Sequence, residues 1–207
     1  MDLDDINARL RDLHPTEIIR WALDLKRPTV TTTSFSPNSA AMLHLATRVD
    51  PEMTILWVDS GYNMADCYQV AEQLIRQLQL RIRVYLPSMS SERRNALMGG
   101  IPHPSDSEEL FREFVRQVKL EPFERAIREL NTEVWITGIR REETEHRRSL
   151  DIVTRDGRGL LKVAPLFYWT AADVAAYMAE HELPSCKHYF DPTKLNDHAE
   201  CGLHTAA

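Results

Sequence analysis

The sequence predicts an α/β protein with a mostly parallel, five-to-six-stranded sheet flanked by helices, of the adenine-nucleotide alpha-hydrolase-like kind, ending in a mobile C-terminal tail. Short apolar and β-branched runs alternate with helical segments along most of the chain. The run "MTILWVDS" at 53–60 is almost continuously apolar, which is typical of a strand buried in a parallel sheet. The chain has 207 residues, 43% of them hydrophobic, which is enough for one core.

Each element follows from a local pattern. The region 4–25 has apolar residues at helical spacing, but His14-Pro15 interrupts it, so one helix and two short helices both fit. Residues 88–107, with Gly99-Gly100 and nearby prolines, are interpreted as a loop. Strands are expected at 28–35, 53–60, 81–86, 133–139 and 160–167. Further helices are expected at 36–49, 63–79, 107–130 and 170–181.

Composition narrows the function classes. The net charge is −6 and the pI is about 5.8, which argues against a general nucleic-acid-binding surface. No apolar run has the length of a membrane span, and the first 30 residues lack a signal-peptide core, so we expect a cytoplasmic protein without membrane contact. Cys67, Cys186 and Cys201 make an odd number, which argues against a disulfide framework and allows a working thiol.

Two polar turns follow predicted strands. In "SFSPNS" (34–39), the backbone N–H groups, the helix start and the hydroxyls of Ser34, Ser36 and Ser39 could cradle a phosphate, although plain helix capping also fits. In "VDSGY" (58–62), Asp59 could accept hydrogen bonds from a nucleoside and Gly61 allows close backbone approach, although an ordinary turn also fits.

The third polar segment, "TGIRREETEHRRS" (137–149), is rich in arginine just past a strand. The guanidinium fork of Arg140, Arg141 and Arg147 suits phosphate or sulfate, although the intervening glutamates also fit a self-paired charged face. Ligand sites in parallel sheets lie at the carboxyl ends of the strands, where all three segments are expected. Together they predict a site for an anionic nucleotide.

These residues, in this order, resemble the phosphoadenylyl-sulfate and adenylyl-sulfate reductases of the PP-loop superfamily. "TTSFSPNSAAMLHL" resembles the modified PP-loop, with Phe35 and the small residues after it, and "WVDSGYNMADCYQVAEQL" is similar to the "DTGY…ETY" segment. "VKLEPFERAIRELNTEVWITGIRREETEHRRSL" and "KVAPLFYWTAADVAAYM" are similar to two further family segments, and "ECGLH" is the C-terminal signature. The match covers roughly 28–184 and the last few residues.

The resemblance implies reduction of 3′-phosphoadenylyl sulfate to sulfite and adenosine 3′,5′-bisphosphate. Cys201 would attack sulfur to give an enzyme S-sulfocysteine, with thioredoxin or glutaredoxin as the reductant. Independently of the resemblance, His204 could assist in charge balance. Two domains are expected: residues 1–184 bind the sulfonucleotide, and the tail 185–207 carries Cys201. A homo-oligomer is also expected. The expected substrate-binding residues are Ser34, Phe35, Ser36, Asn38, Ser39, Asp59, Gly61, Gly138, Arg140, Arg141 and Arg147.

No bound cofactor and no metal are expected. Three cysteines cannot supply the four thiolates of an iron–sulfur cluster, which favours the 3′-phosphorylated substrate over adenylyl sulfate. Ser36 and Pro37 stand where the family usually has glycine and an aliphatic residue, and Cys67 replaces a usual threonine. The segment before "ECGLH" is also shorter than in the family.

Three other functions stay open at this stage. The tail cysteines and histidines, Cys186, His188, His198, Cys201 and His204, could bind zinc in a non-reductase, although their spacing matches no common zinc pattern. A PP-loop ATP pyrophosphatase or sulfurtransferase is less favoured because 34–39 lacks the aspartate of "SGGxDS". A non-catalytic nucleotide-binding regulator is less favoured because the cysteine of "ECGLH" is present.

Overall fold

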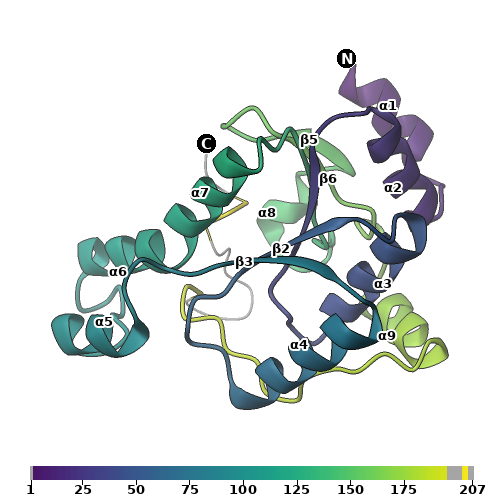
Figure 1. Ribbon diagram of the computed structural model, residues 1–207. Coiled ribbons are helices and arrows are strands. Elements are labelled where there is room, and N and C mark those ends of the chain that lie inside the picture. The colour runs from purple at the N-terminus through teal and green to yellow at the C-terminus, as the bar shows by residue number, and fades with distance from the viewer. Residues whose placement is uncertain (1, 195–201, 205–207) are drawn as a thin grey trace.

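A computed structural model of the chain describes residues 2–194 and 202–204. Within these residues a six-stranded sheet has the order β3-β2-β1-β4-β6-β5 (Figure 1). Neighbouring strands pair in parallel, except that β5 runs antiparallel to β6. The predicted fold class is confirmed. The strands are β1 Thr29–Thr33, β2 Thr54–Val58, β3 Arg81–Tyr85, β4 Val134–Ile136, β5 Val153–Arg155 and β6 Leu161–Val163.

The helices lie between these strands in the predicted alternation. The chain opens with two helices rather than one, because Pro15 begins the second helix after His14 caps it. The helices are α1 Leu3–Leu10, α2 Pro15–Asp24, α3 Ser39–Val49, α4 Ala65–Gln77, α5 Ser91–Met98, α6 Glu108–Val115, α7 Glu121–Glu129, α8 Glu145–Arg148 and α9 Ala171–Glu180. The π-helical turn η1 Arg116–Leu120 joins α6 to α7.

Strand β5 and helix α8 were not expected from the sequence, and two expected segments have a different structure. The loop expected at 88–107 contains α5, whose first turn is capped by the Ser90 hydroxyl and whose last is ended by Gly99 at φ 74°. The single helix expected at 107–130 is divided by η1. Pro122 lacks the backbone N–H that a regular helix would donate there, and the wider turn lies just before it.

The core lies on both faces of the sheet. Helices α2, α3, α4 and α9 cover one face, and α7 covers the other (Figure 1). On the α7 face, Phe123 and Ala126 pack against Leu56 and Trp135 of the strands. Helices α5 and α6 lie together to one side of this body (Figure 1). In the described part of the chain, no helix combines the length and apolar character that crossing a membrane requires.

The strand order fixes where a crevice can open. Strand β1 pairs with β2 on one side and β4 on the other, so the connection after β1 leads to β2 while the connection after β4 leads in the opposite direction, to β5 and β6. Such a point of reversal opens a crevice at the carboxyl ends of the two diverging strands. In this fold the crevice is therefore expected where β1 and β4 end.

Candidate functional site

A cavity of about 220 Å³ lies at the carboxyl ends of β1 and β4. Its walls come from the loop after β1, the loop after β4, the π turn η1 and the last described residues of the chain. Eight residues predicted from sequence line it: Ser34, Ser36, Asn38, Ser39, Gly138, Arg140, Arg147 and His204. The folded chain therefore brings most of the predicted site residues to one place.

Phe35 shapes the loop after β1 instead of lining the cavity. Its side chain is 1% exposed and packs edge-on against Trp57, with 4.8 Å between ring centroids. Its φ of 50° lies in the left-handed region, which is unusual for a non-glycine residue and recurs at functional sites. With Phe35 turned into the core, its neighbours Ser34 and Ser36 line the cavity.

The start of α3 faces the same space. The Ser36 and Ser39 hydroxyls lie 3.0 Å apart, and both residues line the cavity together with Asn38. Among the described residues, no side chain caps the first turn of α3. Backbone N–H groups at such a helix start, with the positive end of the helix dipole, favour an anion.

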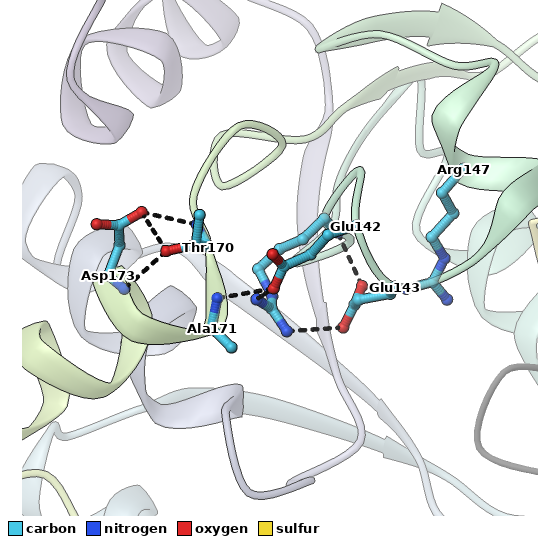
Figure 2. Close-up of polar contacts among 7 residues, drawn as sticks. Glu142, Glu143, Arg147, Thr170, Ala171 and Asp173 are labelled. Carbon is cyan, nitrogen blue, oxygen red and sulfur yellow. Dashed lines mark hydrogen bonds and ion pairs between the residues drawn. The ribbon is translucent and has the colours of Figure 1, made fainter.

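Two buried arginines provide positive charge opposite this loop. Arg140 and Arg147 are each 6% exposed, and both pair with the Glu143 carboxylate, which accepts at 3.5 Å from Arg140 Nη2. Glu142 accepts from Arg140 Nη1 at 2.6 Å and from the Ala171 backbone N–H at 2.7 Å (Figure 2). These bonds hold the arginine segment against the start of α9.

Lys119 adds a further cation from η1. Its Nζ lies 2.5 Å from Asp191 Oδ2 and 3.1 Å from the Thr193 hydroxyl. Burial raises the pKa of the Asp191 carboxyl, but the Lys119 ammonium and the hydrogen bonds from Thr193 outweigh burial and leave the pKa below its usual value. This ion pair joins the segment after α9 to the cavity wall.

His204 closes another wall of the cavity. Its imidazole stacks on the Trp135 indole, with centroids 4.9 Å apart and ring planes at 12°. Burial, followed by the positive charges of Lys162 and Arg147, holds the pKa of His204 well below its usual value. The ring is therefore neutral in this position at neutral pH, and within the described structure its buried Nδ1 has no hydrogen-bond partner.

Four expected residues do not line the cavity: Phe35, Asp59, Gly61 and Arg141. Phe35 is in the core, as described above. The Asp59 carboxylate accepts from its own turn at the Gly61 N–H (3.0 Å) and from the Tyr68 hydroxyl (2.8 Å). The Arg141 guanidinium lies over the Tyr168 ring at 5.9 Å. Cys201 lies outside the described residues, directly before Gly202.

Other cavity residues were not singled out from sequence. Trp135 could not be assigned to the site from sequence, because an aromatic residue in a strand is ordinarily part of the core. Asp191 could not be assigned either, because it stands in an irregular polar stretch. Lys119 carried a usable signal, since it stands in "VKLEPFERAIRELNTEVWITGIRREETEHRRSL", one of the segments that resemble the family. Lys194 carried no comparable signal. The residues concerned are Lys119, Trp135, Thr137, Asp191 and Lys194.

The cysteines and histidines considered for zinc are separated where the structure describes them. Cys186 lies against Cys67, and their hydrogen bond together with burial raises the pKa of the Cys186 thiol to about 12, burial being the larger cause. His188 lies against Asp66, and His204 against Trp135. Across residues 2–194 and 202–204, no three potential ligands of this kind are grouped to hold a metal ion.

Known proteins are similar to this chain in sequence. The family described as "Phosphoadenosine phosphosulfate reductase domain" matches residues 28–192. The phosphoadenosine 5′-phosphosulfate reductase of a Synechococcus species is 39% identical over 183 residues, covering 88% of this chain and 78% of that one. Its Synechocystis counterpart is 37% identical over 185 residues, covering 89% and 74%.

A solved structure has the same fold. The phosphoadenylyl-sulfate reductase of Candida auris, in a phosphate complex, superposes with a TM-score of 0.77 at 24% identity, covering 89% of this chain and 87% of that one. The sequence matches extend over most of this chain and about three quarters of each relative. This chain therefore belongs to the phosphoadenosine phosphosulfate reductase family.

Proposed function

We propose that this chain reduces 3′-phosphoadenylyl sulfate to sulfite and adenosine 3′,5′-bisphosphate, with Cys201 as the nucleophile. The observation that carries the proposal is the arrangement around the cavity. An uncapped helix start faces two buried arginines, and the residues that directly follow Cys201 form part of the wall. These features support binding of a polyanion beside Leu203 and His204, which follow Cys201 in the sequence.

The proposed reaction has two steps. In the first, the Cys201 thiolate attacks the sulfur of the sulfonucleotide, a sulfur–sulfur bond forms, and the sulfur–oxygen bond to the phosphate breaks. Adenosine 3′,5′-bisphosphate leaves with that oxygen, and its charge is met by the loop at 34–39, Arg140 and Arg147. In the second, one thiol of thioredoxin or glutaredoxin displaces sulfite from Cys201, and the second thiol resolves the mixed disulfide.

The proposal needs no bound redox cofactor, because the reductant supplies both electrons. An iron–sulfur cluster held by this chain alone would need four thiolates, whereas the sequence has three cysteines. A dithiol reductant and three cysteines that stay reduced suit the cytoplasm, and we place the enzyme there. We also propose that the tail from 185 acts as a separate functional unit and that the chain forms a homo-oligomer.

Sulfite release tests this function. The wild-type chain is mixed with 3′-phosphoadenylyl sulfate, thioredoxin and a thioredoxin-reducing system, and sulfite is measured over time. We expect release that requires both thioredoxin and Cys201, with Cys67→Ser as the matched control that keeps activity. Equal or faster release from adenylyl sulfate would reverse the substrate assignment, and release that survives Cys201→Ser would overturn the mechanism.

A further inference from the structure

The three residues after Cys201 contact three separate parts of the domain. A side chain at Gly202, where φ is 81°, would lie 3.6 Å from Leu120 and 3.7 Å from Val115. The Leu203 side chain packs with the core on the α7 face. The His204 ring stacks on Trp135, and its carbonyl oxygen lies 3.3 Å from His146 Nε2.

Arg158 makes a polar contact with this segment. Its Nη2 donates to the Leu203 carbonyl oxygen at 3.0 Å. The turn between β5 and β6 holds the same guanidinium, because Nε donates to Asp156 Oδ2 at 2.8 Å. The side chain is 20% exposed and lies over the Phe123 ring at 4.9 Å. Asp156 and the Phe123 ring therefore orient the guanidinium independently of its contact with the tail.

Arg158 is not among the residues that line the cavity. A contact with the substrate therefore does not explain why a guanidinium is held against the chain end. The Asp156 ion pair, which Nε and Nη2 both make, explains part of its position. Nη2 also donates to the Leu203 carbonyl oxygen, and this second bond joins two segments 45 residues apart.

We propose that Arg158 is a positioning residue: with Trp135 and His146 it forms a receptor for residues 202–204 and thereby sets where Cys201 stands relative to the bound sulfonucleotide. This inference rests on the proposed function, because it assigns Arg158 a role in the sulfur transfer. Adjacent Cα atoms are about 3.8 Å apart. Anchoring Gly202 and Leu203 therefore leaves only rotations about the bonds of Cys201 and the bonds next to it to set the position of its thiol. Loss of the receptor slows transfer and leaves nucleotide binding in place.

A two-by-two comparison tests whether Arg158 acts through the tail. The four chains are wild type, Arg158→Ala, a chain with 202–207 replaced by Gly and Ser, and the combination. The single-turnover rate of sulfo transfer to Cys201 is followed by intact mass without thioredoxin. Arg158→Ala should slow transfer roughly ten- to hundredfold, as for a lost hydrogen bond to a charged group. In the Gly/Ser chain the same substitution should change the rate less than about twofold.

Nucleotide binding and matched variants separate positioning from folding. Binding of adenosine 3′,5′-bisphosphate, measured by calorimetry, should change less than about threefold in Arg158→Ala. Arg158→Lys keeps the charge but loses the planar fork whose Nε and Nη2 both bind Asp156, so its ammonium is held less firmly towards Leu203 and transfer should fall between the wild-type and Arg158→Ala rates. Arg155→Ala, on the same hairpin but exposed, is the control and should react at the wild-type rate. An equal loss from Arg158→Ala in both tail backgrounds would overturn the proposal.

A second readout does not depend on the reaction. Carboxypeptidase removes residues from the chain end without nucleotide, and intact mass shows how far trimming has gone. In the wild-type chain, removal of His204 and Leu203 should be slow, and Arg158→Ala should speed it roughly tenfold or more. Equal trimming rates in the wild-type and Arg158→Ala chains would overturn the proposal that Arg158 holds the tail. If the wild type forms no adduct but trimming responds to Arg158, the receptor holds and the reductase proposal fails.

Discussion

The His204 imidazole is stacked on the Trp135 indole, with 4.9 Å between centroids and 12° between ring planes. This contact joins the last described residue of the chain to a central strand of the sheet. Trp135 is itself fixed, because its indole N–H donates to the Thr32 hydroxyl at 2.8 Å and Phe123 packs beside it. The chain end is therefore seated on a rigid part of the fold, next to the buried arginines.

Tail docking should weaken as the pH falls below about 6.5. The docked position lowers the pKa of His204, so the released tail binds a proton that the docked tail does not. Docking is thus at full strength above pH 6.5. Below that value the equilibrium constant for docking should fall by up to about tenfold per pH unit, until the pKa of the docked ring is reached. Carboxypeptidase trimming from pH 7.5 to 5.0, relative to a free peptide of the same C-terminal sequence, measures this change.

Several charged groups face the His204 ring and define the controls. They are Lys162 on β6, Arg147 and His146 on α8, Lys119 on η1 and Arg158 on the turn between β5 and β6. His146 is the other imidazole among them, so the series is repeated on His146→Gln, which should keep the pH dependence. In His204→Asn the dependence should vanish. A wild-type profile that stays flat from 7.5 to 5.0 would refute the account.

Arg147 should be needed for binding the nucleotide. Arg147→Met removes one of two buried guanidiniums from the cavity and should weaken adenosine 3′,5′-bisphosphate binding at least about tenfold. Arg148→Met is the matched control, because Arg148 is 59% exposed and pairs only with the exposed Glu145 among the described contacts. Calorimetry on both variants, after a melting curve has shown that each is folded, makes the comparison. Similar affinities for the two would contradict the site.

The pair Lys119–Asp191 should contribute to stability as well as to the site. Lys119→Met leaves the Asp191 carboxylate, only 7% exposed, without its cation and should lower the free energy of unfolding by about 3 kcal/mol at pH 7. The loss should shrink towards pH 4, because the unpaired carboxyl takes up a proton there. Urea unfolding measures both values.

An exposed ion pair provides the comparison for this loss. Arg81 and Glu52 are 54% and 80% exposed, so Arg81→Met should cost less than about 1 kcal/mol. Adding Asp191→Leu to Lys119→Met should recover part of the loss, because no charge is then left buried. A double variant less stable than Lys119→Met would show that the pair is not the cause.

Thiol titration should find one fast cysteine in the native protein. Cys67 and Cys186 are buried, and the Cys186 pKa of about 12 leaves almost no thiolate at pH 8. Native protein should therefore release close to one equivalent of reporter thiol per chain from a disulfide reagent within minutes. In denaturant it should release about three. Cys201→Ser should lose the fast equivalent. Two fast equivalents in the native wild type would show that the Cys67–Cys186 environment is open.

Sequence reasoning was strongest where one pattern implied one local structure. The buried strand at 53–60 predicted β2, because apolar continuity acts locally. The Pro15 break fitted one helix or two, and two formed, because proline lacks the backbone N–H. Strand β5 was not predicted, since its three residues depend on pairing with β6. Helix α5 was also missed, because Gly99 marks its end and the prediction treated the glycines as a sign of a loop.

The site residues were also predicted correctly in part. Ser34, Ser36 and Arg140 could be predicted to meet, because residues that follow parallel strands collect at one edge. Asp59 and Arg141 also follow parallel strands. The Asp59 carboxylate nevertheless accepts from the Tyr68 hydroxyl, and the Arg141 guanidinium lies over the Tyr168 ring. Which way a side chain turns depends on partners distant in sequence. The contact between Arg158 and Leu203 is likewise set by the folded chain, since nothing near either residue indicates the other.

The central claim is that Cys201 receives the sulfo group, and intact-protein mass tests it most directly. Reduced protein is incubated without thioredoxin, separately with 3′-phosphoadenylyl sulfate and adenylyl sulfate, and the mass is followed over time. The account predicts an added mass of about 80 Da, one sulfo group, that forms faster with the 3′-phosphorylated nucleotide and is absent in Cys201→Ser. No added mass in a protein that binds the nucleotide, or the same adduct on Cys201→Ser, would contradict it.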